Sequence, residues 1–196
     1  MWGARRFVET CLLTAALVCF TPADKPGPLG LEPTLAAVRI FYAPATDLET
    51  VDRQLIDSAR QSIDMAAYVL TNRGVISALS QAASRGVKVR LYLDPDQAVR
   101  SGQNNNGLFA LLEARNVEAR FKARAADMHL KAFQVDGRML RSGSANFSFT
   151  GAKQQDNDLI LIESREAAST FRTAFERLWM RRDNETFQPL PTGMIR

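Results

Sequence analysis

The stretch Met128–Ser148, MHLKAFQVDGRMLRSGSANFS, decides the fold and holds the single histidine of the chain, His129. Alternate residues of a strand point to one face, so His129 and Lys131 are expected to project together. The dipeptide Asp136-Gly137 is a strong signal for a type I′ hairpin turn. The returning strand, 138–142, then brings a glycine, a hydroxyl and a carboxamide back towards the histidine: Gly143, Ser144 and Asn146.

The groups gathered by this hairpin suit a phosphodiester. An imidazole can attack phosphorus directly and form a covalent phosphohistidine. Lys131 is the expected contact for the phosphate charge, and Asn146 is expected to donate a hydrogen bond to a phosphate oxygen. Ser144 could bond another phosphate oxygen or orient a neighbouring group. Together with His129, these residues are the candidate catalytic and substrate-binding groups.

The pattern H-x-K-x4-D, followed by G-S-x-N, resembles the signature of the phospholipase D superfamily. The match is residue for residue at His129, Lys131, Asp136, Gly143, Ser144 and Asn146. The chain looks most like the small bacterial endonuclease branch, which carries one copy of the motif. The resemblance implies a phosphodiesterase that works in two steps through phosphohistidine, with no metal ion or other cofactor.

The proton donor is missing from the single chain. In this superfamily a second histidine, from a second motif, protonates the leaving group, and this chain has one histidine. The resemblance therefore implies that the second imidazole comes from another copy of the chain. A two-fold homodimer would place both hairpins at one shared site, because a C2 interface is self-complementary.

Three aspartates complete the candidate site. A nucleophilic imidazole needs an orienting group on its other nitrogen, and the family usually has an acidic residue shortly after G-S-x-N. Asp156 is the candidate for that role, and Asp158 is the alternative. Asp136 matches the carboxylate of the motif, although its place in the hairpin turn also suits a structural role.

Basic residues flank the motif, and they could follow the backbone of DNA or RNA or simply solvate strand edges. They are Arg120, Lys122, Arg124, Arg138, Arg141 and Lys153. The net charge of +4 and the pI of about 9.4 agree with nucleic acid or anionic lipid as a partner. These values do not distinguish nucleic acid from anionic lipid.

The N-terminal segment, 1–23, has the pattern of a cleaved secretory signal peptide, which would place the protein outside the cell or in the periplasm. Arg5 and Arg6 precede the apolar run 11–20, and small residues follow at a possible cleavage site. An uncleaved membrane anchor is the alternative, although the run is short for a membrane span. Both cysteines lie in this segment, so the mature chain would have no disulfide and no cysteine-ligated zinc.

Strands alternate with helices after a Pro- and Gly-rich linker, 24–34. This predicts a single α/β domain, 35–183, with a mixed β-sheet flanked by helices on both faces, as in phospholipase D-like nucleases. A tail follows at 184–196. Besides the hairpin, we expect strands at 37–42, 63–70, 87–93, 117–122 and 158–163, helices at 48–59, 73–84, 108–114 and 164–182, a Thr46–Glu49 capping box, and a loop at 97–107.

Three functions stay open. The first is a secreted or periplasmic endonuclease with little sequence preference. The second is a phospholipase D acting on phosphatidyl head groups, since the reacting centre would be the same; such an enzyme should expose an apolar rim, and no long apolar loop is evident. The third is a catalytically silent homologue that binds nucleic acid or a partner, and the intact His129, Lys131 and Asn146 argue against it.

Overall fold

The computed structural model describes residues 36–103, 107–123 and 126–186, with the side chains of 101–103 left aside. The predicted signal peptide, 1–23, and the linker, 24–34, lie outside the described residues, as does 187–196 of the predicted tail. The first residues of that tail form a short strand, so part of it belongs to the sheet.

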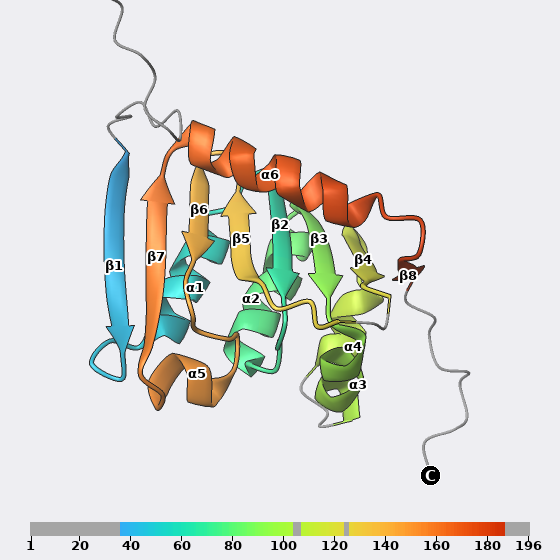
Figure 1. Cartoon of the computed structure of the whole chain (residues 1–196), viewed down its shortest axis with the longest axis horizontal. Coiled ribbons are helices and arrows are strands. Elements are labelled where there is room, and N and C mark those ends of the chain that lie inside the picture. Colours follow the sequence, from blue (N-terminus) through green and yellow to red (C-terminus); the bar gives the residue numbers. More distant parts are fainter. Residues whose placement is uncertain (1–35, 104–106, 124–125, 187–196) are drawn as a thin grey trace, which may run out of the picture. The chain divides into compact units, whose positions relative to one another are not determined.

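In the described part of the chain, eight strands form one mixed sheet in the order β1-β7-β6-β5-β2-β3-β4-β8 (Figure 1). β2, β3 and β4 are parallel, and the other neighbouring pairs are antiparallel. The strands are β1 (Ala37–Ala43), β2 (Ser62–Ala67), β3 (Lys88–Leu93), β4 (Val117–Phe121), β5 (Lys131–Val135), β6 (Met139–Ser142), β7 (Asn157–Glu163) and β8 (Glu185–Thr186).

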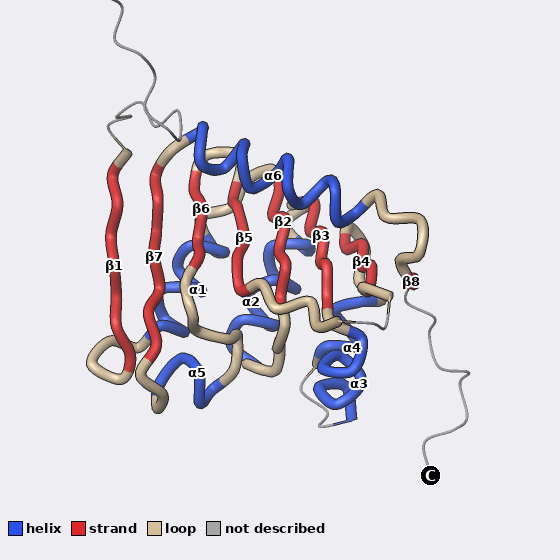
Figure 2. Tube along the Cα trace, in the orientation of Figure 1, coloured by secondary structure: helices blue, strands red, loops and turns tan. Residues whose placement is uncertain are grey.

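Helices cover both faces of this sheet. Figures 1 and 2 show α6 crossing one face, with α1 and α2 on the other. The predicted α/β fold with a mixed sheet between helices is therefore confirmed. The helices are α1 (Leu48–Asp57), α2 (Arg73–Ser84), α3 (Pro95–Gln103), α4 (Leu108–Leu112), α5 (Phe149–Lys153) and α6 (Arg165–Trp179). None of the described helices is long and apolar enough to cross a membrane.

Each face of the sheet buries its own apolar cluster, because successive side chains of a strand alternate between faces. The larger cluster packs under α1 and α2, and includes Ile63, Met65, Leu91 and Phe133. The smaller cluster packs under α6, and consists of Ala66, Tyr92, Met128, Phe175 and Trp179, with Phe171 and Leu178 partly buried against it. The central strands are thus buried on both sides, which makes the sheet a rigid base for its loops.

The strand directions bring the motif to one edge of the sheet. The carboxyl ends of β2 and β3 lie at that edge, and Lys131, the first residue of β5, pairs with Ala67, the last residue of β2. β6 ends at the same edge with Ser142. In open α/β sheets, ligands bind outside the carboxyl ends of the parallel strands, so the fold presents the motif where such sheets bind.

Two local expectations are wrong, and helix capping explains both. Helix α1 is capped by the Asp47 carboxylate, which accepts the backbone N–H of Glu49 at 3.0 Å, and not by a Thr46–Glu49 box. The expected loop at 97–107 is largely α3, which starts because the Asp94 carboxylate accepts the Gln97 N–H at 3.1 Å. Ser164 caps α6, since its hydroxyl accepts the Ala167 N–H.

Candidate active site

His129 and Lys131 lie together at the start of β5. The imidazole is exposed, whereas Lys131 is only 8% exposed. The ammonium donates to the backbone carbonyl of His129 at 2.8 Å and lies 3.2 Å from His129 Nδ1. The backbone N–H of Met128, whose side chain is buried, donates to Asp94 Oδ2 at 3.1 Å and fixes the chain just before the histidine. The predicted pair of imidazole and ammonium is therefore brought together.

The surroundings of Lys131 make its ammonium a strong ligand for an anion. Burial lowers the pKa of Lys131, and the positive charge of Arg141 lowers it further. Among the described residues the ammonium has no carboxylate partner; it lies 4.9 Å from the ring centroid of Tyr68. A partly desolvated charge without a counterion gains most from an incoming anion.

Gly143 and Ser144 shape the loop between β6 and β7. Gly143 has φ of 132°, and a Cβ there would lie 2.5 Å from the carbonyl oxygen of Asp158, so only glycine fits. The Ser144 hydroxyl donates to Asn157 Oδ1 and accepts the N–H of Asp158, both at 3.0 Å. This hydroxyl is therefore engaged in the loop, which suits the orienting role predicted for it better than direct contact with phosphate.

Asn146 has an unsatisfied carboxamide. Its Oδ1 atom is buried without a hydrogen-bond partner, and its side chain makes no hydrogen bond with a described residue. The next residue, Phe147, is held by backbone bonds to the segment that follows β2, with its N–H donating to Val69 and its carbonyl accepting from Asn72. A buried polar group without a partner is costly, so Asn146 remains available for a ligand.

Arg141 ties the two halves of the motif together. Its guanidinium is fully buried and donates to the carbonyls of Lys131, at 2.7 Å, and Ala145, at 3.2 Å. It also forms a two-pronged ion pair with the buried Asp52 of α1. Both alternatives given for Arg141, a basic surface for nucleic acid and a solvated strand edge, are therefore wrong. Sequence reasoning missed this pair, although Arg141 lies two residues after the buried Met139 in β6 and so shares its core-facing side of the strand.

The two candidate orienting carboxylates lie near Ser144. Asp158 Oδ1 accepts the backbone N–H of Ser144 at 3.0 Å, and the hydrogen bonds from Ser144 lower the pKa of Asp158 although burial opposes them. Asp156 is exposed and lines a hollow with Ser144 and Tyr42. Within the described residues neither carboxylate hydrogen-bonds the imidazole of His129. The orienting role of Asp156 stays a prediction.

Asp136 lies at the opposite end of β5 from His129. Five residues of extended chain lead from Lys131 to Asp136, which is a distance of about 16 Å. Its carboxylate accepts the backbone N–H groups of Arg60, Gln61 and Ser62 at 2.8–2.9 Å. Asp136 and Gly137 have φ of 54° and 62°, as a type I′ turn requires. The structure thus joins Asp136 to the loop between α1 and β2 and not to the other motif residues.

The remaining basic residues that flank the motif also have partners. Arg138 pairs with Glu163 at 2.7 Å, and Lys153 pairs with Asp47 and Glu49. Arg120 and Lys122 donate to backbone carbonyls, of Trp179 and Ala126 respectively. Arg124 lies outside the described residues. The described members do not form the open basic surface that would follow a nucleic-acid backbone.

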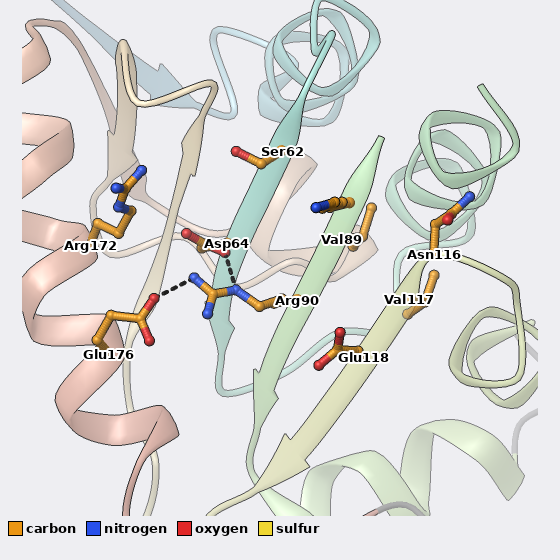
Figure 3. Close-up of a pocket in the computed structure, with 10 residues that line it drawn as sticks. Ser62, Asp64, Val89, Arg90, Asn116, Val117, Glu118, Arg172 and Glu176 are labelled. Carbon is orange, nitrogen blue, oxygen red and sulfur yellow. Dashed lines mark hydrogen bonds and ion pairs between the residues drawn. The ribbon is translucent and has the colours of Figure 1, made fainter. Parts of the chain in front are cut away.

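A cavity of about 530 Å³ lies at the other end of the sheet, on the α6 face (Figure 3). Its walls come from the first residues of β2, β3 and β4, far from the carboxyl ends where His129 lies. Arg90 lines this cavity and pairs with Asp64 at 2.6 Å and Glu176 at 2.7 Å. In the part of the chain that the structure describes, no three His, Cys, Asp or Glu side chains are grouped to hold a metal ion.

A mixed sheet that carries H-x-K and G-S-x-N at the carboxyl edge of its parallel strands, with the aspartate of H-x-K-x4-D at the other end of β5, defines a phospholipase D-like domain. Residues 53–179 match the family model described as "Cardiolipin synthase, PLD-like domain", and the chain belongs to this family. The match covers both halves of the motif and the strands that place them.

Curated relatives carry the names of lipid-cleaving enzymes. The chain is 31% identical over 123 residues to a mitochondrial cardiolipin hydrolase of Danio rerio, covering 62% of this chain and 52% of the relative. It is 31% identical over 118 residues to a phospholipase D of Rickettsia prowazekii, covering 60% and 56%. The chain thus spans about half the length of these relatives.

Solved structures share the fold. Nuc from Salmonella typhimurium, a phospholipase D family member, superposes with a TM-score of 0.69 at 23% identity, covering 78% of this chain and 99% of Nuc. NucT from Helicobacter pylori superposes with a TM-score of 0.66 at 22% identity, covering 78% and 99%. At this identity the likeness is one of fold.

Proposed function

We propose that the chain is a phosphodiesterase that cleaves DNA or RNA by attack of the His129 imidazole on phosphorus. The observation that carries this proposal is the contact between an exposed imidazole and a buried ammonium, with Lys131 Nζ 3.2 Å from His129 Nδ1. A diester anion that meets this pair finds a positive charge beside a nucleophile. The carboxamide of Asn146, whose acceptor atom Oδ1 is buried without a partner, would use its Nδ2–H2 group as a neutral donor to a phosphate oxygen.

The proposed reaction has two displacements. In the first, a nitrogen–phosphorus bond to His129 forms while the bond from phosphorus to the leaving oxygen breaks, and a second imidazole protonates that oxygen. In the second, water attacks phosphorus and gives its proton to the second imidazole, and the bond to His129 breaks. Lys131 and Asn146 hold the charge on the non-bridging oxygens in both steps.

The second imidazole is proposed to come from another copy of the chain, in a homodimer with one shared site. Exposed apolar side chains on β1 support this arrangement: Val38, Ile40 and Tyr42 are 52%, 51% and 61% exposed. They lie on one face of the strand, and the last two line a hollow of about 470 Å³ together with Ser144. A second copy on this surface would lie beside the candidate site.

Sedimentation velocity combined with turnover tests the dimer. Ile40→Glu should give monomers and lose turnover, because each monomer has one imidazole. The matched control is Met180→Glu, at an apolar residue 69% exposed after α6, which should change neither property. A monomer of Ile40→Glu with full activity would exclude the shared site.

A phospholipase D acting on phosphatidyl head groups is the second candidate. Large apolar side chains are exposed near the motif: Leu130, next to His129, is 45% exposed, and Phe149, at the start of α5, is 55% exposed. They are single residues, one just before β5 and one at the start of α5, so no long apolar run marked them in the sequence. The names of the curated relatives also favour this candidate.

One comparison separates the candidates. The purified protein, in the presence of a chelator, is offered plasmid DNA, single-stranded RNA and phosphatidylcholine vesicles in parallel. Cleavage of nucleic acid with intact lipid supports the proposal, and choline release alone supports the second candidate. Binding of DNA without turnover of any substrate would identify a silent homologue. His129→Ala should abolish turnover, whereas Arg165→Ala, at an exposed residue of α6, should not.

A further inference from the structure

Tyr68 is fixed beside the motif by its main chain. It is the first residue after β2, and its backbone N–H donates at 2.8 Å to the carbonyl of Leu130, the residue between His129 and Lys131. Tyr68 is not part of H-x-K-x4-D or G-S-x-N. Its position is set by the pairing of β2 with β5, which extends by this one bond beyond the ends of the strands.

The ring of Tyr68 contacts both reactive side chains. Its centroid lies 4.6 Å from that of the His129 imidazole, with 51° between the planes, and 4.9 Å from Lys131 Nζ. The negative face of an aromatic ring attracts a cation, most strongly where water is excluded. Since Lys131 is buried and has no carboxylate partner among the described residues, this ring face adds electrostatic support to that of the His129 carbonyl, 2.8 Å from Nζ.

The hydroxyl of Tyr68 is held at the far end of the ring. It accepts a hydrogen bond from Gln97 Nε2 of α3 at 3.3 Å. Burial raises the pKa of Tyr68, and the negative charges of Asp127 and Asp94 raise it further, so the hydroxyl stays protonated. The ring is thus anchored at both ends and cannot turn away from Lys131 without breaking these bonds.

The ammonium has a defined effect on the imidazole. An ammonium has three donors and no acceptor, so His129 Nδ1 must accept and the neutral imidazole carries its proton on Nε2. For attack by Nε2, the proton must move to Nδ1, which requires Lys131 to leave that atom. A bound diester anion provides the alternative partner for the ammonium, and the nucleophilic tautomer then becomes accessible.

We propose that Tyr68 is a positioning residue whose ring face holds the Lys131 ammonium between His129 Nδ1 and the incoming phosphate. The proposal rests on the proposed phosphodiesterase function. The charged and titratable groups around the contact are His129, Arg141, Asp94 and Asp127. Tyr68 touches no reacting atom, so its effect on turnover passes through the placement of Lys131 for the phosphate, and the tautomer of His129 reports where the ammonium lies.

Replacing the ring without changing its shape tests the proposal. Tyr68 is replaced by phenylalanine, which keeps the negative face of the ring, or by pentafluorophenylalanine, in which the face of the ring is positive. Turnover of bis(p-nitrophenyl) phosphate should stay near the original level for Tyr68→Phe and fall about 10-fold for the fluorinated ring. The matched control is Tyr92→Phe, which removes a hydroxyl that bonds Asn184 and belongs to the apolar cluster under α6.

The single histidine supplies a second readout that needs no turnover. In ¹⁵N-labelled protein, the shifts of the two imidazole nitrogens report the tautomer of His129 directly. The fluorinated ring should shift the neutral imidazole away from the Nε2–H form, as Lys131→Met should. Equal turnover and equal nitrogen shifts for the two rings would overturn the role of Tyr68. If the unmodified protein cleaves no diester, the proposed function fails, and the nitrogen shifts still decide on Tyr68.

Discussion

Arg141 and Asp52 form a buried two-pronged ion pair that joins β6 to α1, with Nε–Oδ1 of 2.8 Å and Nη2–Oδ2 of 3.1 Å. Neither side chain is more than 2% exposed. The same guanidinium donates to the carbonyls of Lys131 and Ala145, one in each half of the motif. The pair therefore positions the backbone on both sides of the candidate site.

Removing the Asp52 carboxylate should lower the free energy of unfolding by a large fraction. Asp52→Ala leaves the Arg141 guanidinium buried without its counterion, which costs about 3–5 kcal/mol. Urea unfolding measures this loss. The control is Asp57→Ala, at an exposed residue of the same helix, with an expected change within about 0.5 kcal/mol. Equal stability of the two variants would show that the pair contributes little.

The hairpin could be predicted because its signal is local. Asp136-Gly137 tolerates the positive φ that both residues adopt, and the turn then sets the pairing of β5 with β6. Helix α3 was missed although its signal was also local. An aspartate before a proline, as in Asp94-Pro95, suits an N-cap followed by the first helical residue.

The support of the site could not be predicted in this way. Asp52 and Arg141 are 89 positions apart, and only the packing of α1 against the sheet brings them together. Tyr68 likewise meets His129 through the pairing of β2 with β5, which no local pattern records. Sequence reasoning found the residues that carry the motif and missed those that hold it in place.

The three backbone bonds of Asp136 predict a structural effect of its removal. Asp136→Ala should lower the free energy of unfolding by about 1–3 kcal/mol, because three N–H groups lose a charged acceptor. Turnover per folded molecule should be unchanged, since the carboxylate lies at the far end of β5. Asp136→Asn should recover part of the stability. A loss of turnover in fully folded Asp136→Ala would instead place this carboxylate in the chemistry.

Ser144 should contribute to stability in a pH-dependent manner. Its hydrogen bonds lower the pKa of Asp158 below the ordinary value of 3.8. The stabilisation is therefore fully present above the unfolded-state pKa and is lost as the pH falls through the lower folded-state pKa. Ser144→Ala should be less stable than the unmodified protein at about pH 6, with a smaller difference at about pH 2. Ser84→Ala, at an exposed residue of α2, should show no such convergence.

Removal of the Lys131 ammonium should impair the reaction more than the fold. Lys131→Met keeps the length of the side chain and should reduce kcat about 10²–10³-fold, the range for loss of one preorganised charge donor. Lys88→Met, at an exposed lysine at the far end of the sheet, is the matched control and should keep its turnover. Turnover within a few-fold of normal in Lys131→Met would remove Lys131 from the mechanism.

The lowered pKa of Lys131 also predicts the alkaline side of the pH profile. The dependence of kcat/KM on pH reports the free enzyme, and the protonated ammonium is the form that holds phosphate. Activity should therefore fall as the pH rises through the folded-state pKa of Lys131, which burial and Arg141 place below the ordinary 10.5. The pKa of Tyr68 is raised, so its ionisation follows only at higher pH. In Lys131→Arg the guanidinium stays charged, so the alkaline fall in activity should disappear. If the fall persists in Lys131→Arg, another group causes it.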